Sequence, residues 1–250
     1  MLVLDSGMFA ALSLGFLLGL KHATDADHVV AVSTIAGEFG NAWRGIWVGA
    51  SWGLGHTTPL LAVGVLILLL KEAVLDRYEA VAPVLEFGVG IMLVVLGAQV
   101  FFNLRRGRLH AHAHAHSGAG HVHIHATHPA GAEPPEPDRH GFFRPGPPMF
   151  RLKSFLIGTV HGLAGSAAVM LVLLPQISSF WVGVGYLVVF GIGTMISMAM
   201  ITVMLGVPFA VGGRFRGLDR VVARVAGTAS LLFGFGLMAD LALGTALLPF

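Results

Sequence analysis

A charged stretch inside an apolar run constrains this chain more than any other feature of its sequence. The stretch is segment 21–28, Lys-His-Ala-Thr-Asp-Ala-Asp-His, with apolar segments 9–20 before it and 29–35 after it. Together they predict one helix over residues 8–36, long enough to cross a bilayer, with its polar residues near mid-depth. A charge at the centre of a membrane helix costs roughly 2.5–3.5 kcal/mol, so Lys21 and the two aspartates should face protein, water or a bound cation.

The spacing of these polar residues favours metal coordination. At about 100° per residue, His22, Asp25 and His28 fall within one arc of roughly 120° on a helix, whereas Asp27 points elsewhere unless the helix is broken. Two imidazoles and a carboxylate suit a borderline divalent metal such as nickel, cobalt or zinc. The alternative is a buried ion-pair network of Lys21 with the aspartates, in which the histidines are only hydrogen-bonded.

The composition is that of an all-α, polytopic integral membrane protein. The 250 residues are 55% hydrophobic and only 11% charged, with a mean hydropathy of +0.80, whereas soluble domains average about 25% charged residues. There is no cysteine, which excludes disulfides, thiolate metal sites and dithiol redox chemistry. The basic residues lie in the loops, where they indicate membrane topology rather than a nucleic-acid surface.

We expect six transmembrane helices, because one span needs about 20 apolar residues. Segment 71–80 is predicted to be a short charged connection, and Pro175 and Pro208 stand near helix ends. Most lysines and arginines fall on one side of the spans, which predicts a cytoplasmic location for that side of the membrane and an outside location for both termini. The expected helices are 8–36, 43–70, 82–104, 152–174, 180–206 and 219–246.

The two halves of the chain repeat one another. Residues 16–22 align with 155–161 and Trp43 with Trp181, and glycines of the later helices match at the same offset of 138 or 139. Because each half holds three spans, the second copy begins on the opposite side of the membrane. This predicts a 3+3 inverted-topology repeat, the build of many secondary transporters. The first repeat, a His-rich disordered cytoplasmic loop and the second repeat then occupy 1–104, 105–150 and 151–250.

Two further histidines lie inside the expected spans. His56 is in the middle of 43–70, three residues before Pro59, which weakens the helical hydrogen bonds near it. His161 is the repeat mate of His22. Each is a candidate metal ligand. The alternative is a histidine that is only hydrogen-bonded in the core and, for His161, a relic of the repeat.

Two acids stand outside this group. Glu86 and Asp240 lie near the ends of their expected helices. We therefore interpret both as surface acids whose side chains reach the membrane boundary. A proton-carrying role is the alternative for Glu86.

The polar segment 105–150 holds a dense run of histidines. Histidine alternates with other residues from His110 to His116 and again from His121 to His125. The composition of alanine, glycine, proline and histidine lacks a core-forming pattern, so we expect no regular structure there. Such a tract would gather divalent metals near the cytoplasmic face, as a reservoir or a sensor. The alternative is a solvated linker.

Three motifs resemble the nickel/cobalt transporter family (NiCoT). Segment 22–28 reads His-Ala-Thr-Asp-Ala-Asp-His, segment 55–58 reads Gly-His-Thr-Thr, and segment 161–166 reads His-Gly-Leu-Ala-Gly-Ser, as in urease-associated relatives of the family. Lys21 stands where the family usually has arginine, and 190–197 lacks the two acids of a later family signature. The chain therefore resembles a divergent branch of the family. The resemblance implies metal ligands among His22, Asp25, Asp27, His28, His56 and His161.

The motifs and the composition together predict transport. We expect a permease that moves Ni²⁺ and/or Co²⁺ across the cytoplasmic membrane in the direction of uptake, with no cofactor beyond the transported ion. The sequence contains no phosphate-binding loop, so this chain does not hydrolyse ATP. The expected partners are the metal ion, the lipid bilayer, a second copy of the chain and the maturation of nickel enzymes, but not nucleic acid. The alternatives are a divalent-metal efflux permease, a membrane-embedded metalloenzyme and a metal-sensing subunit of a larger assembly.

Overall fold

The structure, a computed structural model, is a bundle of long helices with one small hairpin. It describes residues 6–36, 42–70, 72–106, 110–116, 119–125, 150–163, 173–177, 179–212 and 218–245. The elements in chain order are α1 (Ser6–His22), α2 (Ala26–Ala36), α3 (Ala42–Leu70), α4 (Glu72–Arg105), β1 (His110–His116), β2 (Ala119–His125), α5 (Leu152–Gly162), the short 3₁₀ helix η2 (Leu174–Gln176), α7 (Phe180–Gly212) and α8 (Leu218–Leu243).

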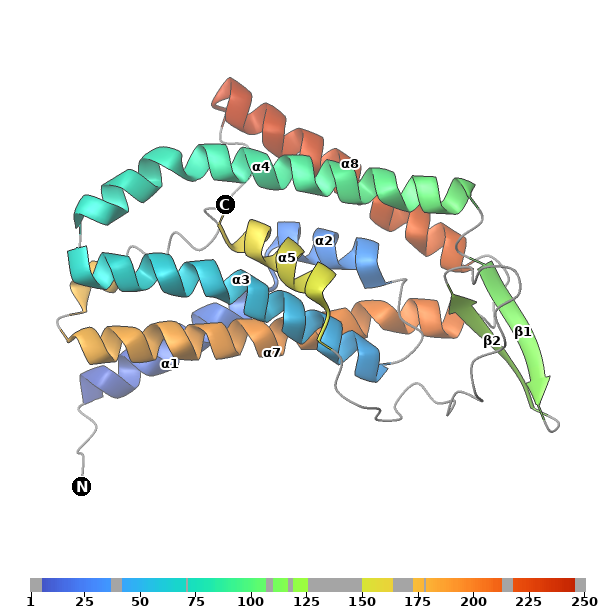
Figure 1. Cartoon of the computed structure of the whole chain (residues 1–250), viewed down its shortest axis with the longest axis horizontal. Helices are drawn as coiled ribbons and strands as arrows, with labels where there is room; N and C mark the ends of the chain where they lie inside the picture. The colour runs from blue at the N-terminus through green and yellow to red at the C-terminus, as the bar shows by residue number, and fades with distance from the viewer. Residues whose placement is uncertain are drawn as a thin grey trace.

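The helices are arranged in two layers with two short helices between them (Figure 1). Helices α4 and α8 lie side by side in one layer, and α1, α3 and α7 form the other. In that second layer, α3 packs along α7, α1 lies against α7, and α5 lies against α3. Helix α2 joins the layers because it contacts both α7 and α8.

The long apolar helices confirm a membrane architecture. Among the described residues, four helices are long and apolar enough to cross a bilayer, and a fifth span is added if α1 and α2 are counted together. The predictions for 43–70, 180–206 and 219–246 agree with α3, α7 and α8. Helix α5 begins where the helix over 152–174 was expected but ends at Gly162, and 164–172 lies outside the described residues.

Two predicted boundaries are wrong. The expected single helix over 8–36 is two helices, α1 and α2, bent by 54° at the break between them. The expected connection at 71–80 is instead the start of α4, which runs without a stop from Glu72 to Arg105. No glycine separates the charged part from the apolar part, and Pro83 lies inside the helix rather than at its end.

The histidine-rich segment also differs from its expectation in part. Strands β1 and β2 pair antiparallel, with His110 opposite His125 and His112 opposite His123, where we expected no regular structure. Alternation of small and larger residues at period two is a strand pattern, and this explains the pairing. Figure 1 shows the hairpin beyond the ends of α4 and α7. The rest of 105–150, apart from the end of α4, Arg106 and Phe150, lies outside the described residues.

The core consists of two apolar clusters, and Leu85 of α4 packs against both. One cluster draws on α2, α3, α4, α7 and α8 and includes Trp52 and Leu93. The other lies mainly between α3 and α7 and includes Leu60, Tyr186 and Phe190. Burial of these large side chains fixes how the helices cross, and therefore where the polar residues of their middle turns lie.

Glycines allow the helix backbones to touch around this core. A methyl group added at Gly19 would overlap the carbonyl oxygen of Phe190, and one added at Gly158 would overlap that of Trp52. Small residues permit such close crossings, which stabilise helix pairs in membranes through van der Waals packing. The position of α5 against α3 therefore depends on Gly158.

This dependence predicts a stability difference between two glycine-to-alanine variants. Gly158→Ala should lower the free energy of unfolding of the detergent-solubilised protein by about 1–3 kcal/mol or more, because the added methyl group overpacks the contact between the helices. The thermal unfolding midpoint should fall accordingly. Gly88→Ala is the matched control, because no atom lies within 4 Å of the added carbon there and alanine favours a helix. Equal midpoints for the two variants would contradict the packing that the structure shows.

Candidate metal centre

The polar cluster is built at the break between α1 and α2. The chain leaves α1 in a tight turn in which the amide of Thr24 donates to the carbonyl of Lys21 (2.9 Å) and the Thr24 hydroxyl donates to the same carbonyl (2.6 Å). Threonine hydroxyls that bond to nearby backbone compete with helical hydrogen bonds, which explains the local break. The break turns α2 away from the axis of α1, so the residues on its two sides no longer follow one helical spacing.

One half of the cluster is organised around His22. Its Nδ1 donates to Oδ2 of Asp25 (3.1 Å), and its Nε2 lies 2.8 Å from Nε2 of His56 on α3. Asp25 also accepts a hydrogen bond from Nζ of Lys21 at 3.0 Å. His56 is the midpoint of α3, so this half of the cluster lies midway along a membrane-length helix.

The other half is organised around Asp27. Its Oδ1 accepts from Nδ1 of His28 (2.9 Å), and its Oδ2 accepts from Nε2 of His161 on α5 (2.8 Å). In an unbroken helix Asp27 would point away from His22 and His28. With the helix broken, Asp27 is buried and lies between two imidazoles, one from each half of the chain.

The four imidazoles converge. The rings of His28 and His161 are stacked with centroids 4.1 Å apart, and the ring of His28 also lies 4.6 Å from that of His22 and 4.8 Å from that of His56. Two groups could each hold a metal ion with ligand atoms within 4.8 Å of one another: His22 with His28 and His56, and Asp27 with His28 and His161. His28 belongs to both groups.

The burial of these side chains is nearly complete. Relative exposure is 0% for His28, His56 and His161, 3% for Asp27 and 4% for His22. Within the described part of the chain, Nε2 of His28, Nδ1 of His56 and Nδ1 of His161 have no hydrogen-bond partner. A buried polar atom without a partner costs about 1–3 kcal/mol, so three in one cluster need an explanation such as a bound ion.

The carboxylates decide which ring nitrogens are free. A carboxylate only accepts hydrogen bonds, so the nitrogens that face Asp25 and Asp27 carry the hydrogen when the rings are neutral. The remaining nitrogens then carry no hydrogen and each offers a lone pair: Nε2 of His22, Nε2 of His28 and Nδ1 of His161. Because Nε2 of His22 carries no hydrogen, Nε2 of His56 donates to it, and the lone pair of the His56 ring is on Nδ1. Carboxylates that orient imidazoles in this way are typical supports of metal ligands.

Close helix contact holds the cluster in place. Gly162, directly after His161, packs against the backbone of His56, where a methyl group would overlap the carbonyl oxygen. The sequence reasoning assigned no role to Trp52 and Phe190, yet Trp52 lies 6.1 Å from the ring of His161 and Phe190 lies 5.6 Å from that of His22. Their equivalent places in the two repeats, 138 residues apart, were the signal that could have found them.

The structure brings all of the predicted site residues together. Hydrogen bonds join these residues in two sets of three, one of His22, Asp25 and His56 and the other of Asp27, His28 and His161. The ring contacts of His28 connect the two halves of the cluster.

The two other acids lie apart from this hydrogen-bonded cluster. Asp240 lies near the end of α8, as expected, and accepts a hydrogen bond from the hydroxyl of Thr245. Glu86 is not near a helix end, because α4 begins ten residues earlier than predicted and its side chain is half-buried.

Comparison with known proteins shows the family to which the chain belongs. The chain is 35% identical over 234 residues to urease accessory protein UreH of Bacillus sp. (strain TB-90), a match that covers 94% of this chain and 92% of that protein. No family model and no solved structure matches the chain.

Two plant proteins are more distant relatives. The chain is 26% identical over 205 residues to chloroplast protein FOR GROWTH AND FERTILITY 1 of Arabidopsis thaliana, and 28% identical over 194 residues to FOR GROWTH AND FERTILITY 2. These matches cover 80% and 77% of this chain but 51% and 46% of the plant proteins. The chain thus spans about half of their length.

The chain is a bundle with membrane-length helices and a buried cluster of histidines, and it matches a urease accessory protein over almost its whole length. The chain belongs to the family of urease accessory protein UreH, and its resemblance to the urease-associated branch of the nickel/cobalt transporters is confirmed.

Proposed function

We propose that this chain is a secondary transporter of Ni²⁺ and/or Co²⁺ and that the His/Asp cluster is its transport site. The observation that carries the proposal is the set of four buried imidazoles at the helix break, three of which hold a nitrogen without a partner. Imidazole nitrogens are suitable ligands for nickel and cobalt, and a neutral ring can release its ion more readily than a thiolate.

In this proposal the histidines bind the ion and the aspartates position them. The ion would be held by His28 together with His22 and His56, or by His28 together with His161 and Asp27. Asp25 and Asp27 already use their oxygens to hold the opposite ring nitrogens, which argues for a supporting role in this arrangement. Their negative charges would also offset the charge of the ion in a region remote from water.

We propose six spans in a 3+3 inverted repeat around this site. The glycine contacts support it, because Gly19 touches Phe190 as Gly158 touches Trp52, and these pairs are related by the same offset of 138 or 139. The pairing of α1 with α7 likewise matches that of α5 with α3. Two halves that move against each other around a central site would give alternating access.

For the direction of transport we propose uptake across the cytoplasmic membrane, with both termini outside and the His-rich segment inside. Two positive charges that enter a cell with an inside-negative potential of 100 mV move down this potential and gain about 4.6 kcal/mol, so the potential can drive uptake. The relative named for its accessory role in urease suggests that the ion supplies a nickel enzyme. Radioactive nickel accumulation in cells tests the proposal, and unchanged accumulation with normal expression would exclude it.

Asp27→Asn should reduce nickel uptake strongly. An amide can accept from one imidazole but presents a donor to the other, so the hydrogen bond to His28 or to His161 is lost and that ring is no longer held. Loss of such an outer partner typically costs about 10–100-fold in metal affinity. Asp76→Asn is the matched control, because Asp76 is exposed on α4 and its variant should transport like the wild type.

We propose that the His-rich segment gathers metal near the cytoplasmic mouth of the transport path. Deletion of 110–128 should reduce nickel accumulation a few-fold without abolishing it, because the transport site remains intact. A variant of full length with every histidine of 110–128 changed to asparagine separates the two interpretations. It should behave like the deletion if the imidazoles matter, and like the wild type if the segment is only a linker.

A further inference from the structure

Lys21 is the most exposed charge next to the buried cluster. Its side chain is 73% exposed, whereas the side chain of Asp25, to which it is bonded, is 23% exposed and that of His22 is 5% exposed. His22 contacts the midpoint of α3, so the ammonium lies near mid-depth of the spans. A charge there is costly against lipid, so the exposed side of Lys21 must face water.

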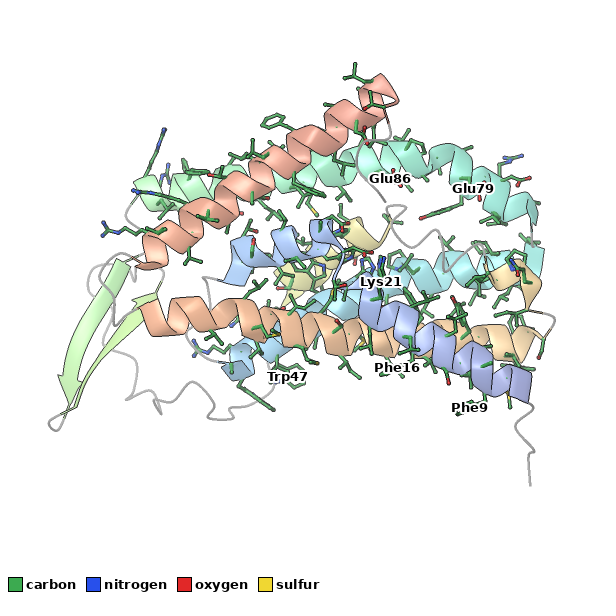
Figure 2. All side chains as sticks on the ribbon, turned by 180° about the vertical axis from the view of Figure 1, so that it is seen from behind. Phe9, Phe16, Lys21, Trp47, Glu79 and Glu86 are labelled. Carbon is green, nitrogen blue, oxygen red and sulfur yellow. The ribbon has the colours of Figure 1, made fainter. Side chains whose placement is uncertain are left out.

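The direction of this exposure marks where the cluster is reached. The imidazoles are buried, whereas Lys21 and Thr24 at the turn after α1 are exposed and Asp25 is partly exposed. Figure 2 shows Lys21 at the inner end of α1, in the middle of the molecule, with Glu86 on α4 in the other layer. An ion that approaches His22 through water therefore meets Lys21 before it meets any imidazole.

A single carboxylate connects Lys21 to the cluster. Asp25 accepts from Nζ of Lys21 on one oxygen and from Nδ1 of His22 on the other, at 3.0 Å and 3.1 Å. While the ammonium stays there it neutralises Asp25 and repels a divalent cation. The lysine side chain is a flexible stem with a compact charge, so it can leave this position without moving the backbone.

We propose that Lys21 is the gate of the metal site: its ammonium is the counter-ion of Asp25 while the site is empty, and it swings away from Asp25 when a divalent ion binds. The proposal rests on the proposed function of the cluster. Its consequence is weaker binding and faster release of the ion. By repelling the bound ion, Lys21 keeps the affinity low enough for the ion to leave on the other side.

Two substitutions separate charge from structure. Lys21→Gln keeps a donor for Asp25 but removes the charge, whereas Lys21→Arg keeps the charge. A structural role at the end of α1 would make the glutamine variant less stable without tightening metal binding. Arg220→Gln is the matched control, because it removes an exposed charge near the start of α8, and no hydrogen bond or ion pair found among the described residues links Arg220 to the cluster.

The experiment measures Ni²⁺ binding to the full-length protein by calorimetry, and initial transport rates in proteoliposomes. Lys21→Gln should bind Ni²⁺ on the order of tenfold more tightly, because a repulsive charge is gone, and should show a lower KM and a lower turnover rate. Lys21→Arg and Arg220→Gln should stay within about threefold of the wild type on this electrostatic argument. Unchanged or weaker binding by Lys21→Gln would overturn the gate while leaving the transport site intact. Absence of Ni²⁺ binding by the wild type would overturn both.

A second measurement uses the wild-type protein and does not depend on a variant that folds. A water-soluble amine reagent should label Lys21, and Ni²⁺ should speed that labelling by releasing the ammonium from Asp25. Lys153, exposed on α5, is the internal reference, and its labelling should not respond to Ni²⁺. A Lys21 that stays unlabelled while Lys153 reacts, or a rate that Ni²⁺ leaves unchanged, would contradict the gate.

Discussion

The arrangement at the centre of this protein depends on the two hydrogen bonds that Asp27 accepts. One comes from His28 on α2 and the other from His161 on α5, residues 133 positions apart in the sequence. A carboxylate buried to this degree is costly unless both oxygens are paired, and here each oxygen has a partner. The same two bonds join the halves of the chain and leave the other nitrogen of each ring buried without a hydrogen-bond partner among the described residues. The same pair of hydrogen bonds therefore holds the two halves together and orients the histidines of the candidate metal site.

That interaction exists only because the first membrane-length segment is broken. In a continuous helix the side chains of His22, Asp25 and His28 would form one stripe, and Asp27 would face another direction. The turn at 23–25, closed by the bonds of Thr24 to Lys21, reorients α2 and brings Asp27 inside. The turn also leaves the side chain of Lys21 exposed while its neighbour His22 is buried. A broken helix thus supplies both a buried polar site and, in our proposal, its controlled opening.

Sequence reasoning succeeded where one strong pattern acts over many residues. The long apolar runs placed α3, α7 and α8 within a few residues, apart from a longer C-terminal end of α7, and the density of histidine and aspartate in 22–28 located the cluster. It failed where a few local contacts decide whether a helix continues or ends. The charged residues after Lys71 read as a connection but continue into the helix α4, and the hydrogen bonds of Thr24 break a segment that hydrophobicity alone predicts as continuous. Helix boundaries depend on such single contacts, which composition does not reveal.

The sequence by itself determined that this chain is a membrane protein without thiol chemistry and that its polar residues had to be buried together. It also determined the family, through motifs that the match to urease accessory protein UreH confirms. Only the tertiary structure decided which ring nitrogens are held by carboxylates and which are free, and that the side chain of Lys21 is exposed. The physical reason is range: apolar periodicity acts between neighbours in the chain, whereas the tautomer of each histidine depends on a partner brought by helix packing from a distant part of the sequence.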